Sequence, residues 1–172
     1  MPKALLTIEE ILELDHILVK TYAFFQELRA LSPVARLIHY PSIPSLLSES
    51  LTIHCAELFF GNGWTARFGG RVCDVIIERM GEQQTVEVKA TGQTNFQEFK
   101  AKDLNADFLV WVHFGDRYLK GGGNIDIYIL RNLQAYFGEP LRLKLRDFFE
   151  RTEGSSDLTH IEAESLRSLL RS

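Results

Sequence analysis

The spacing of apolar residues changes its period once along the chain. In the first third the spacing is helical, with apolar residues every three or four positions. Thr7 and Glu10 form a capping-box pattern, with a hydroxyl at the N-cap and a carboxylate three residues later. The pattern predicts a long helix over residues 7–31. A second helix is predicted over 45–60, because Gly61-Asn62-Gly63 follows it as a C-terminal signal.

Beyond residue 63 the period falls to two, as in strands with one buried face. Turn signals divide this region into the three predicted strands of a meander, at residues 64–68, 71–79 and 85–89. A short amphipathic segment, 96–104, is predicted to be a helix that crosses over the sheet. The run Ala106–Phe114 is almost continuously apolar, which is typical of a strand buried on both faces.

The last third is predicted to add one strand, 125–130, and two helical stretches, of which the second begins near Ser156. We therefore expect an α/β fold with a restriction-endonuclease-like mixed central sheet flanked by helices. Its αβββαβ core covers about residues 45–130 of a single domain, 1–172. The long N-terminal helix precedes this core, and a helical extension, 131–172, follows it.

Composition limits the function classes without choosing one. With 45% hydrophobic and 24% charged residues, the chain has the composition of an ordinary globular protein. Its formal net charge of −4 argues against a protein that coats nucleic acid non-specifically, which needs clustered positive charge. The charge does not exclude a nuclease, because bound divalent cations neutralise part of an acidic cleft.

Neither the cysteines nor the N-terminal segment indicate a zinc-binding, exported or membrane protein. Cys55 and Cys73 stand apart without zinc-ligand spacing, and we expect both to be buried and reduced. Acidic residues interrupt the apolar positions near the N-terminus, and no apolar run approaches membrane-spanning length. We therefore predict a cytoplasmic protein with no membrane contact.

Candidate chemistry gathers on the second and third predicted strands. Glu87 and Lys89 stand two residues apart on the third strand, so their side chains project from the same face. The turn at 81–84 can bring Asp74 of the second strand beside them. A second triplet of the same spacing, Glu98-Phe99-Lys100, falls in the predicted helix, where residues i and i+2 do not share a face. This context selects the first triplet.

These residue types suit the hydrolysis of a phosphodiester. The carboxylates of Asp74 and Glu87 would form an oxygen-rich site for a hard cation such as Mg²⁺. Lys89 would orient or help to deprotonate an attacking water and stabilise charge that develops on the phosphate. Acid-x-Lys triplets are common by chance, so the inference depends on the position of this one on a strand.

A resemblance to a known family rests on two stretches, RVCDVII and TVEVKATGQTNFQEFKAKDLNADFLVWVHF. They resemble the core of the PD-(D/E)XK nuclease superfamily and, within it, the type II restriction endonucleases. The resemblance covers roughly residues 45–114. It implies a metal-dependent DNA endonuclease in which Asp74 and Glu87 bind Mg²⁺, with Mn²⁺ expected to substitute, and in which Lys89 assists the water.

The same resemblance implies further residues. Family members often add a glutamate on the helix before the meander, and Glu57 is the matching candidate for the catalytic set. Gln97 matches a supporting polar residue of some relatives. Cys73 stands where the motif has proline, a position that the family keeps loosely.

Double-stranded DNA is the expected partner and a homodimer the expected assembly, because a two-fold pair places two active centres across a duplex. Positive charge is sparse but local, and the candidate DNA-contacting residues are Arg67, Arg71, Gln97, Lys100, Lys102, Arg117 and Lys120. The segment 141–146 also alternates like a strand with one basic face. Two alternatives stay open: a structure-selective repair or junction-resolving nuclease, and a catalytically silent DNA-binding or scaffolding domain of the same fold. RNA as a substrate stays open as well.

Overall fold

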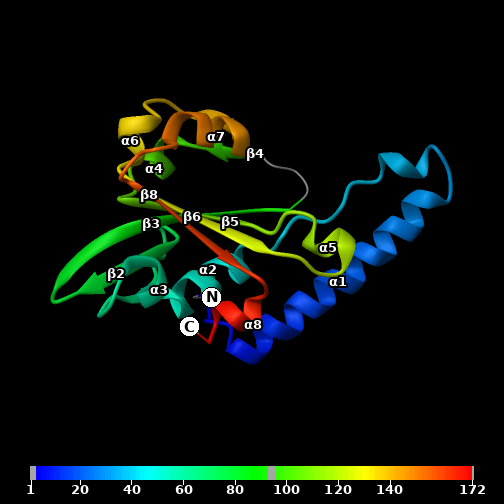
Figure 1. The fold of residues 1–172 in the computed structure, drawn as a ribbon, viewed down its shortest axis with the longest axis horizontal. Helices are drawn as coiled ribbons and strands as arrows, with labels where there is room; N and C mark the ends of the chain where they lie inside the picture. Colours follow the sequence, from blue (N-terminus) through cyan, green and yellow to red (C-terminus); the bar gives the residue numbers. More distant parts are fainter. Residues whose placement is uncertain (1–2, 93–95, 172) are drawn as a thin grey trace.

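A six-stranded sheet forms the centre of the molecule (Figure 1). The structure is a computed structural model and describes residues 3–92 and 96–171. In spatial order the strands of this sheet are β1 (Thr65–Phe68), β2 (Val75–Arg79), β3 (Glu82–Thr91), β5 (Phe108–His113), β6 (Ile125–Arg131) and β8 (Leu158–Ala163). Neighbouring strands run antiparallel, except that β3 and β5 are parallel. The fold is therefore mixed α/β with a mostly antiparallel central sheet.

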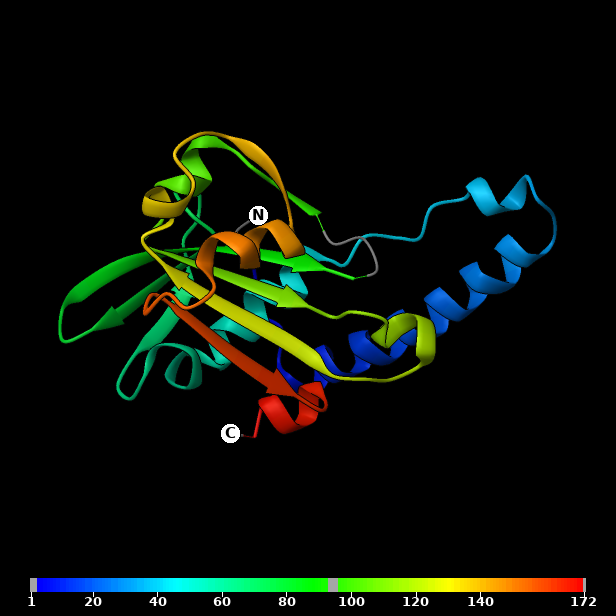
Figure 2. The same cartoon turned by 45° about the horizontal axis from the view of Figure 1, so that its top comes forward.

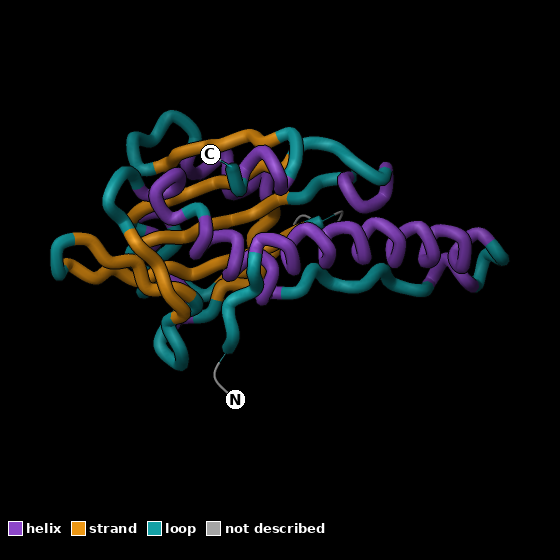
Figure 3. The backbone as a smooth tube through the Cα atoms, turned by 90° about the horizontal axis from the view of Figure 1, so that it is seen from below, coloured by secondary structure: helices purple, strands orange, loops and turns teal. Residues whose placement is uncertain are grey.

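Different elements cover the two faces of the sheet (Figures 1 and 3). One face, here called the α2 face, packs against α1 (Ile8–Ala30), α2 (Ser45–His54), α3 (Ala56–Phe60), α5 (Arg117–Lys120) and α8 (Leu166–Leu169). The opposite face, the α7 face, packs against α4 (Ala101–Leu104), α6 (Leu133–Tyr136), α7 (Leu145–Thr152) and a two-stranded ribbon of β4 (Phe96–Phe99) and β7 (Leu141–Lys144). Each face of the sheet thus has its own apolar core.

Strand β5 contributes to both cores. Val110 and Val112 belong to the core on the α2 face, and Leu109 and Trp111 to the core on the α7 face. All four side chains are fully buried. Because successive side chains of a strand alternate between its faces, only an unbroken apolar run can satisfy both cores, and the prediction for this segment is confirmed.

Helix α1 begins as its capping box predicts. The backbone N–H of Glu10 donates to the Thr7 hydroxyl at 3.2 Å, and the backbone N–H of Thr7 donates to the Glu10 carboxylate at 2.8 Å. The far half of the helix projects beyond the sheet, where the 3₁₀ turn η1 (Ala35–Leu37) follows it (Figures 2 and 3). The predicted helix 45–60 is interrupted at Cys55, which separates α2 from α3.

Two segments expected to be helical contain strands. Residues 96–104 form strand β4 and a single helical turn, α4. The expected helical extension, 131–172, contains strands β7 and β8 beside its helices. Apolar spacing in such short segments fits either state, and pairing with a distant strand decides between them. Here β4 pairs with β7, and β8 pairs with the outer edge of β6.

Within residues 3–92 and 96–171, no helix is both long enough and apolar enough to cross a membrane.

Candidate active site

A pocket of about 480 Å³ lies beside the second half of β3. Residues of β3, the first turns of α2, the segment 41–43 and Gln97 of β4 contribute to its wall. Its charged lining consists of three acids and two lysines: Glu49, Asp74, Glu87, Lys3 and Lys89. Pockets for small organic ligands are mostly apolar, so this lining indicates a charged ligand instead.

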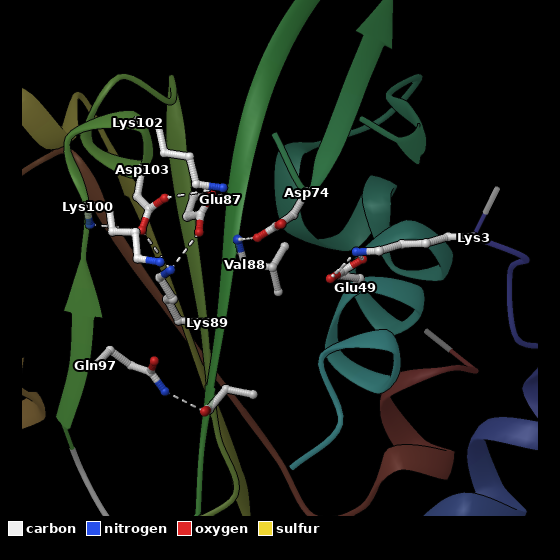
Figure 4. A network of polar contacts seen from close by, with 11 residues as sticks. Lys3, Glu49, Asp74, Glu87, Val88, Lys89, Gln97, Lys100, Lys102 and Asp103 are labelled. Atoms are coloured by element: carbon white, nitrogen blue, oxygen red, sulfur yellow. Dashed lines mark hydrogen bonds and ion pairs between the residues drawn. The ribbon is translucent and has the colours of Figure 1, made fainter. Parts of the chain in front are cut away.

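The β2–β3 hairpin positions Asp74 at this pocket. The register pairs Val75 with Val86, so Asp74 lies just before β2, beside Glu87, and not inside the strand as predicted. The backbone N–H of Val88 donates a hydrogen bond to Oδ2 of Asp74 at 3.0 Å, which fixes this carboxylate against β3 (Figure 4). The structure thus brings Asp74, Glu87 and Lys89 to the wall of one pocket.

Lys89 is held by two carboxylates. Its Nζ donates to Oε1 of Glu87 at 2.6 Å and to Oδ2 of Asp103 at 3.0 Å. Burial lowers the pKa of Lys89, but the hydrogen bonds and charges of Glu87 and Asp103 outweigh burial and raise this pKa above its ordinary value. Lys89 is therefore a fixed ammonium ion at neutral pH. It is suited to orienting water or binding phosphate oxygens and unsuited to accepting a proton.

Glu87 is a buried acid of the pocket whose pKa is raised. Its side chain is only 5% exposed. Burial raises the pKa of Glu87 to about 7, against the hydrogen bond and charge of Lys89, which lower it, and with a further rise from the charges of Asp74 and Asp103. A buried carboxyl in this state gains free energy from any additional cation that approaches it.

Glu49 of α2 is a pocket acid that the sequence did not single out. It is 2% exposed, and both of its oxygens accept hydrogen bonds from Nζ of Lys3, at 2.5 and 2.7 Å (Figure 4). The residues from Leu47 to Thr52 are all buried, and they span more than one turn, so this stretch of α2 is enclosed on all sides. An acid inside such a buried stretch was the available signal, because buried carboxylates need a partner or a metal.

The candidate Glu57 lies away from the pocket. It belongs to α3, is exposed, and its Oε1 accepts a hydrogen bond from the backbone N–H of Gly63 at 3.1 Å. The break at Cys55 changes the direction of the chain before Glu57 is reached. The choice of Glu57 as the helix glutamate is therefore wrong, and Glu49 is the acid that this helix region supplies to the pocket.

Asp103 of α4 is a second acid that sequence analysis missed. It is 2% exposed, and its Oδ2 accepts hydrogen bonds from Nζ of Lys89 and from the backbone N–H of Lys100, both at 3.0 Å. Its Oδ1 is buried and accepts no hydrogen bond from the residues that the structure describes, with Nζ of Lys102 4.0 Å away. Asp103 therefore anchors Lys89 from the α7 face of the sheet.

The donor set fits a hard cation in composition but not as a preformed cage. In Figure 4, Glu87 and Lys89 point toward Asp103, while Asp74 lies on the side of β3 that faces Glu49. Among the described residues, no three His, Cys, Asp or Glu side chains converge closely enough to hold a metal ion. Carboxylate oxygens are nonetheless the ligands that Mg²⁺ prefers. Ammonium groups already lie against two of the three pocket acids, Glu49 and Glu87.

The candidate DNA-contacting residues separate into three groups. Arg67, Arg71, Lys100 and Lys102 are exposed and available. Gln97 lines the pocket and donates to the carbonyl oxygen of Ala90 at 2.6 Å. The remaining two have partners within the molecule: Arg117 forms a two-pronged salt bridge with Asp15 of α1, at 2.6 and 3.1 Å, and exposed Lys120 pairs with Asp116. Arg117 is therefore a structural residue, and its assignment to DNA contact is wrong.

Comparison with protein-family models, with characterised proteins and with solved structures found no match to this chain.

Proposed function

We propose that this chain is a Mg²⁺-dependent DNA endonuclease of the PD-(D/E)XK type. One observation carries the proposal: the hairpin acids Asp74 and Glu87, the strand lysine Lys89 and the buried helix acid Glu49 all line one pocket. The order of elements also supports it, because α2 precedes the β1–β2–β3 meander and β4 and α4 then lead to β5, parallel to β3. With helix α3 and strand β4 as additions, this order supports the proposed αβββαβ nuclease core.

The chemistry assigned to the pocket is hydrolysis of a phosphodiester. Asp74, Glu87 and Glu49 would hold Mg²⁺, with Mn²⁺ able to replace it. The ion would neutralise charge on the scissile phosphate and make water a better nucleophile. Lys89, a fixed ammonium, would bind a phosphate oxygen or the attacking water. Asp103 would keep Lys89 in place.

The proposed substrate is double-stranded DNA, cut by a homodimer as a restriction enzyme. The projecting arm of α1 and η1 supports the dimer, because it exposes apolar side chains at its far end: Phe24, Leu31, Val34 and Leu37. Exposed apolar patches of this kind mark interaction sites. Light scattering would test the dimer, with a 19.7 kDa species alone, with and without DNA, counting against it.

Incubation with mixed plasmid and phage DNA in the presence of Mg²⁺ tests the function directly. Discrete fragments that are lost in both Asp74→Ala and Lys89→Ala, and kept in the exposed control Glu98→Ala, are the expected result. Nicking, or cleavage of branched but not linear DNA, would indicate a repair or junction-resolving nuclease instead. The absence of cleavage of DNA and RNA in both Mg²⁺ and Mn²⁺ would overturn the proposal.

A catalytically silent domain is the second candidate, and one observation favours it. Two pocket acids, Glu49 and Glu87, are already paired with lysines, and no three ligand-type side chains among the described residues converge on one point. Calorimetric titration with Mg²⁺ and Mn²⁺ separates the two candidates. An enzyme should bind these ions, and Asp74→Ala should weaken the binding, whereas a silent domain should show no saturable binding.

A further inference from the structure

The β4–β7 ribbon has one buried and one exposed face. The buried face carries Phe99 and Leu143, each 1% exposed, which pack in the core on the α7 face of the sheet. Directly opposite residues of an antiparallel pair share a face, and the register pairs Phe96 with Lys144 and Glu98 with Arg142. All four of these side chains are exposed, so the outward face of the ribbon consists of Phe96, Glu98, Arg142 and Lys144.

This outward face is basic on a protein of net negative charge. Exposed Lys100 and Lys102 adjoin it at the end of β4 (Figure 4), so four exposed cations accompany the exposed carboxylate of Glu98 and the buried carboxylate of Asp103, which lies 4.0 Å from Lys102. The guanidinium carbon of Arg142 lies 4.9 Å from the centre of the Phe96 ring. Clustered cations beside an exposed aromatic ring are the surface that nucleic acid recognises, through phosphate contacts and stacking.

The inner face of the ribbon contributes to the candidate active site. Gln97 of β4 lines the catalytic pocket and donates to the carbonyl oxygen of Ala90 in β3 (Figure 4). Asp103, just beyond β4, holds Lys89. The pocket and the outward face therefore lie on opposite faces of the same narrow ribbon, and a two-stranded ribbon has dimensions that the major groove of DNA admits.

We infer that the outward face of the β4–β7 ribbon docks duplex DNA beside the catalytic pocket. The inference rests on the proposed function, whose substrate it deepens. Lys100, Lys102 and Lys144 contact phosphates, and the Arg142–Phe96 pair faces the groove. The ribbon thus supplies the positive charge that the acidic pocket lacks.

Fluorescence anisotropy with a labelled 30-base-pair duplex tests the inference on the full chain, with Ca²⁺ present so that the pocket acids are neutralised. The double variant Arg142→Gln/Lys144→Gln should weaken binding about tenfold and reduce the slope of log affinity against log salt by about two. The matched control, Lys20→Gln/Arg167→Gln, removes one lysine and one arginine that are exposed on α1 and α8. It should change both quantities less than twofold. Equal losses in the two double variants, or none in either, would overturn the inference.

Two further measurements distinguish this inference from the function it rests on. Under Mg²⁺, the ribbon variant should cut DNA with a raised KM and an unchanged kcat. If this variant cuts DNA with the KM of the wild type, the ribbon does not dock DNA, and the proposed nuclease activity is unaffected by that result. If the wild type does not cut DNA but the ribbon variant still binds DNA more weakly than the control variant, the nuclease proposal is wrong and the docking surface is supported. Tighter binding of duplex RNA than of duplex DNA would overturn DNA as the partner.

Discussion

The two acid-x-Lys triplets of this chain have the same spacing but lie on different strands and in different environments. Glu87 and Lys89 lie on central strand β3, against the pocket, and form an ion pair of 2.6 Å. The buried carboxylate of Asp103 forms a second ion pair with Lys89. Glu98 and Lys100 lie on and just after β4, and both are exposed to solvent. The same residue types at the same spacing thus meet low-dielectric surroundings in one place and water in the other.

The comparison shows that burial, and not spacing, gives such a triplet unusual chemistry. A carboxyl at Glu87 is desolvated, so its pKa is raised to about 7, and Lys89 is fixed by two acids in one orientation. An exposed ion pair is screened and contributes little free energy. We therefore expect every substitution in the first triplet to have a larger consequence than its counterpart in the second.

The largest expected difference is in catalysis. Lys89→Ala should lower kcat at saturating DNA by about 10²–10³-fold or more, because a charged group aimed at the phosphate is lost. Lys100→Ala should change kcat at saturating DNA less than twofold, since a phosphate contact outside the pocket affects binding and not the chemical step. Rates of plasmid cleavage measure both. Equal effects of the two substitutions would contradict a special role for the buried triplet.

Asp103 treats the two lysines differently, because it accepts a hydrogen bond from the ammonium of Lys89 but from the backbone N–H of Lys100. Asp103→Asn should reduce kcat about 10–100-fold, as losses of such supporting acids do, through release of Lys89. The exposed acid Asp116 supplies the control, and Asp116→Asn should leave kcat unchanged. In a pH profile, the Asn variant should lose activity at a lower pH on the alkaline side, since the pKa of Lys89 falls with one acid removed. An unshifted profile would contradict the positioning role.

Stability in the absence of divalent cations should differ between the two glutamates. The folded-state pKa of Glu87 is raised from 4.5 to about 7, so the native state binds more protons than the unfolded state between these values. The stabilisation of the folded state that follows from this raised pKa is present below pH 4.5 and is lost as pH rises through 7. Glu87→Gln should therefore unfold in EDTA at pH 8 with a free energy higher by about 1–3 kcal/mol, while Glu98→Gln should match the wild type. Urea titrations at pH 4 and pH 8 measure this, and a gain at pH 4 alone would contradict it.

The smallest expected effect concerns Lys3, whose ammonium stands against Glu49 where a divalent cation would compete for the same oxygens. Lys3→Gln should tighten Mg²⁺ binding roughly threefold to tenfold, because one local positive charge is removed. The exposed Lys20→Gln is the matched control. Calorimetry measures both affinities, and a weaker affinity in Lys3→Gln would contradict this competition.

Local periodicity in the sequence was enough to predict several of the helices and strands. The capping box and helical spacing predicted α1, the alternation at 64–89 predicted the β1–β2–β3 meander, and the continuous apolar run predicted β5. These features depend on contacts between near neighbours in sequence and on which faces of an element are apolar. They were sufficient to predict the hairpin that carries Asp74, Glu87 and Lys89, but not that Asp74 would lie on the other side of β3 from the other two side chains.

The features that join distant parts of the chain could not be predicted from local sequence and are seen only in the tertiary structure. Strand β4 exists because it pairs with β7, more than forty residues away, so Glu98 and Phe99 lie on a strand with Lys100 directly after it, and the prediction of a helix at this triplet was wrong. Glu49 and not Glu57 reaches the pocket because of where α2 packs and where Cys55 interrupts it. Asp103 reaches Lys89 because the chain after β4 returns over the sheet. Burial depends on the whole fold, and it is burial that separates a reactive carboxylate from a solvated one.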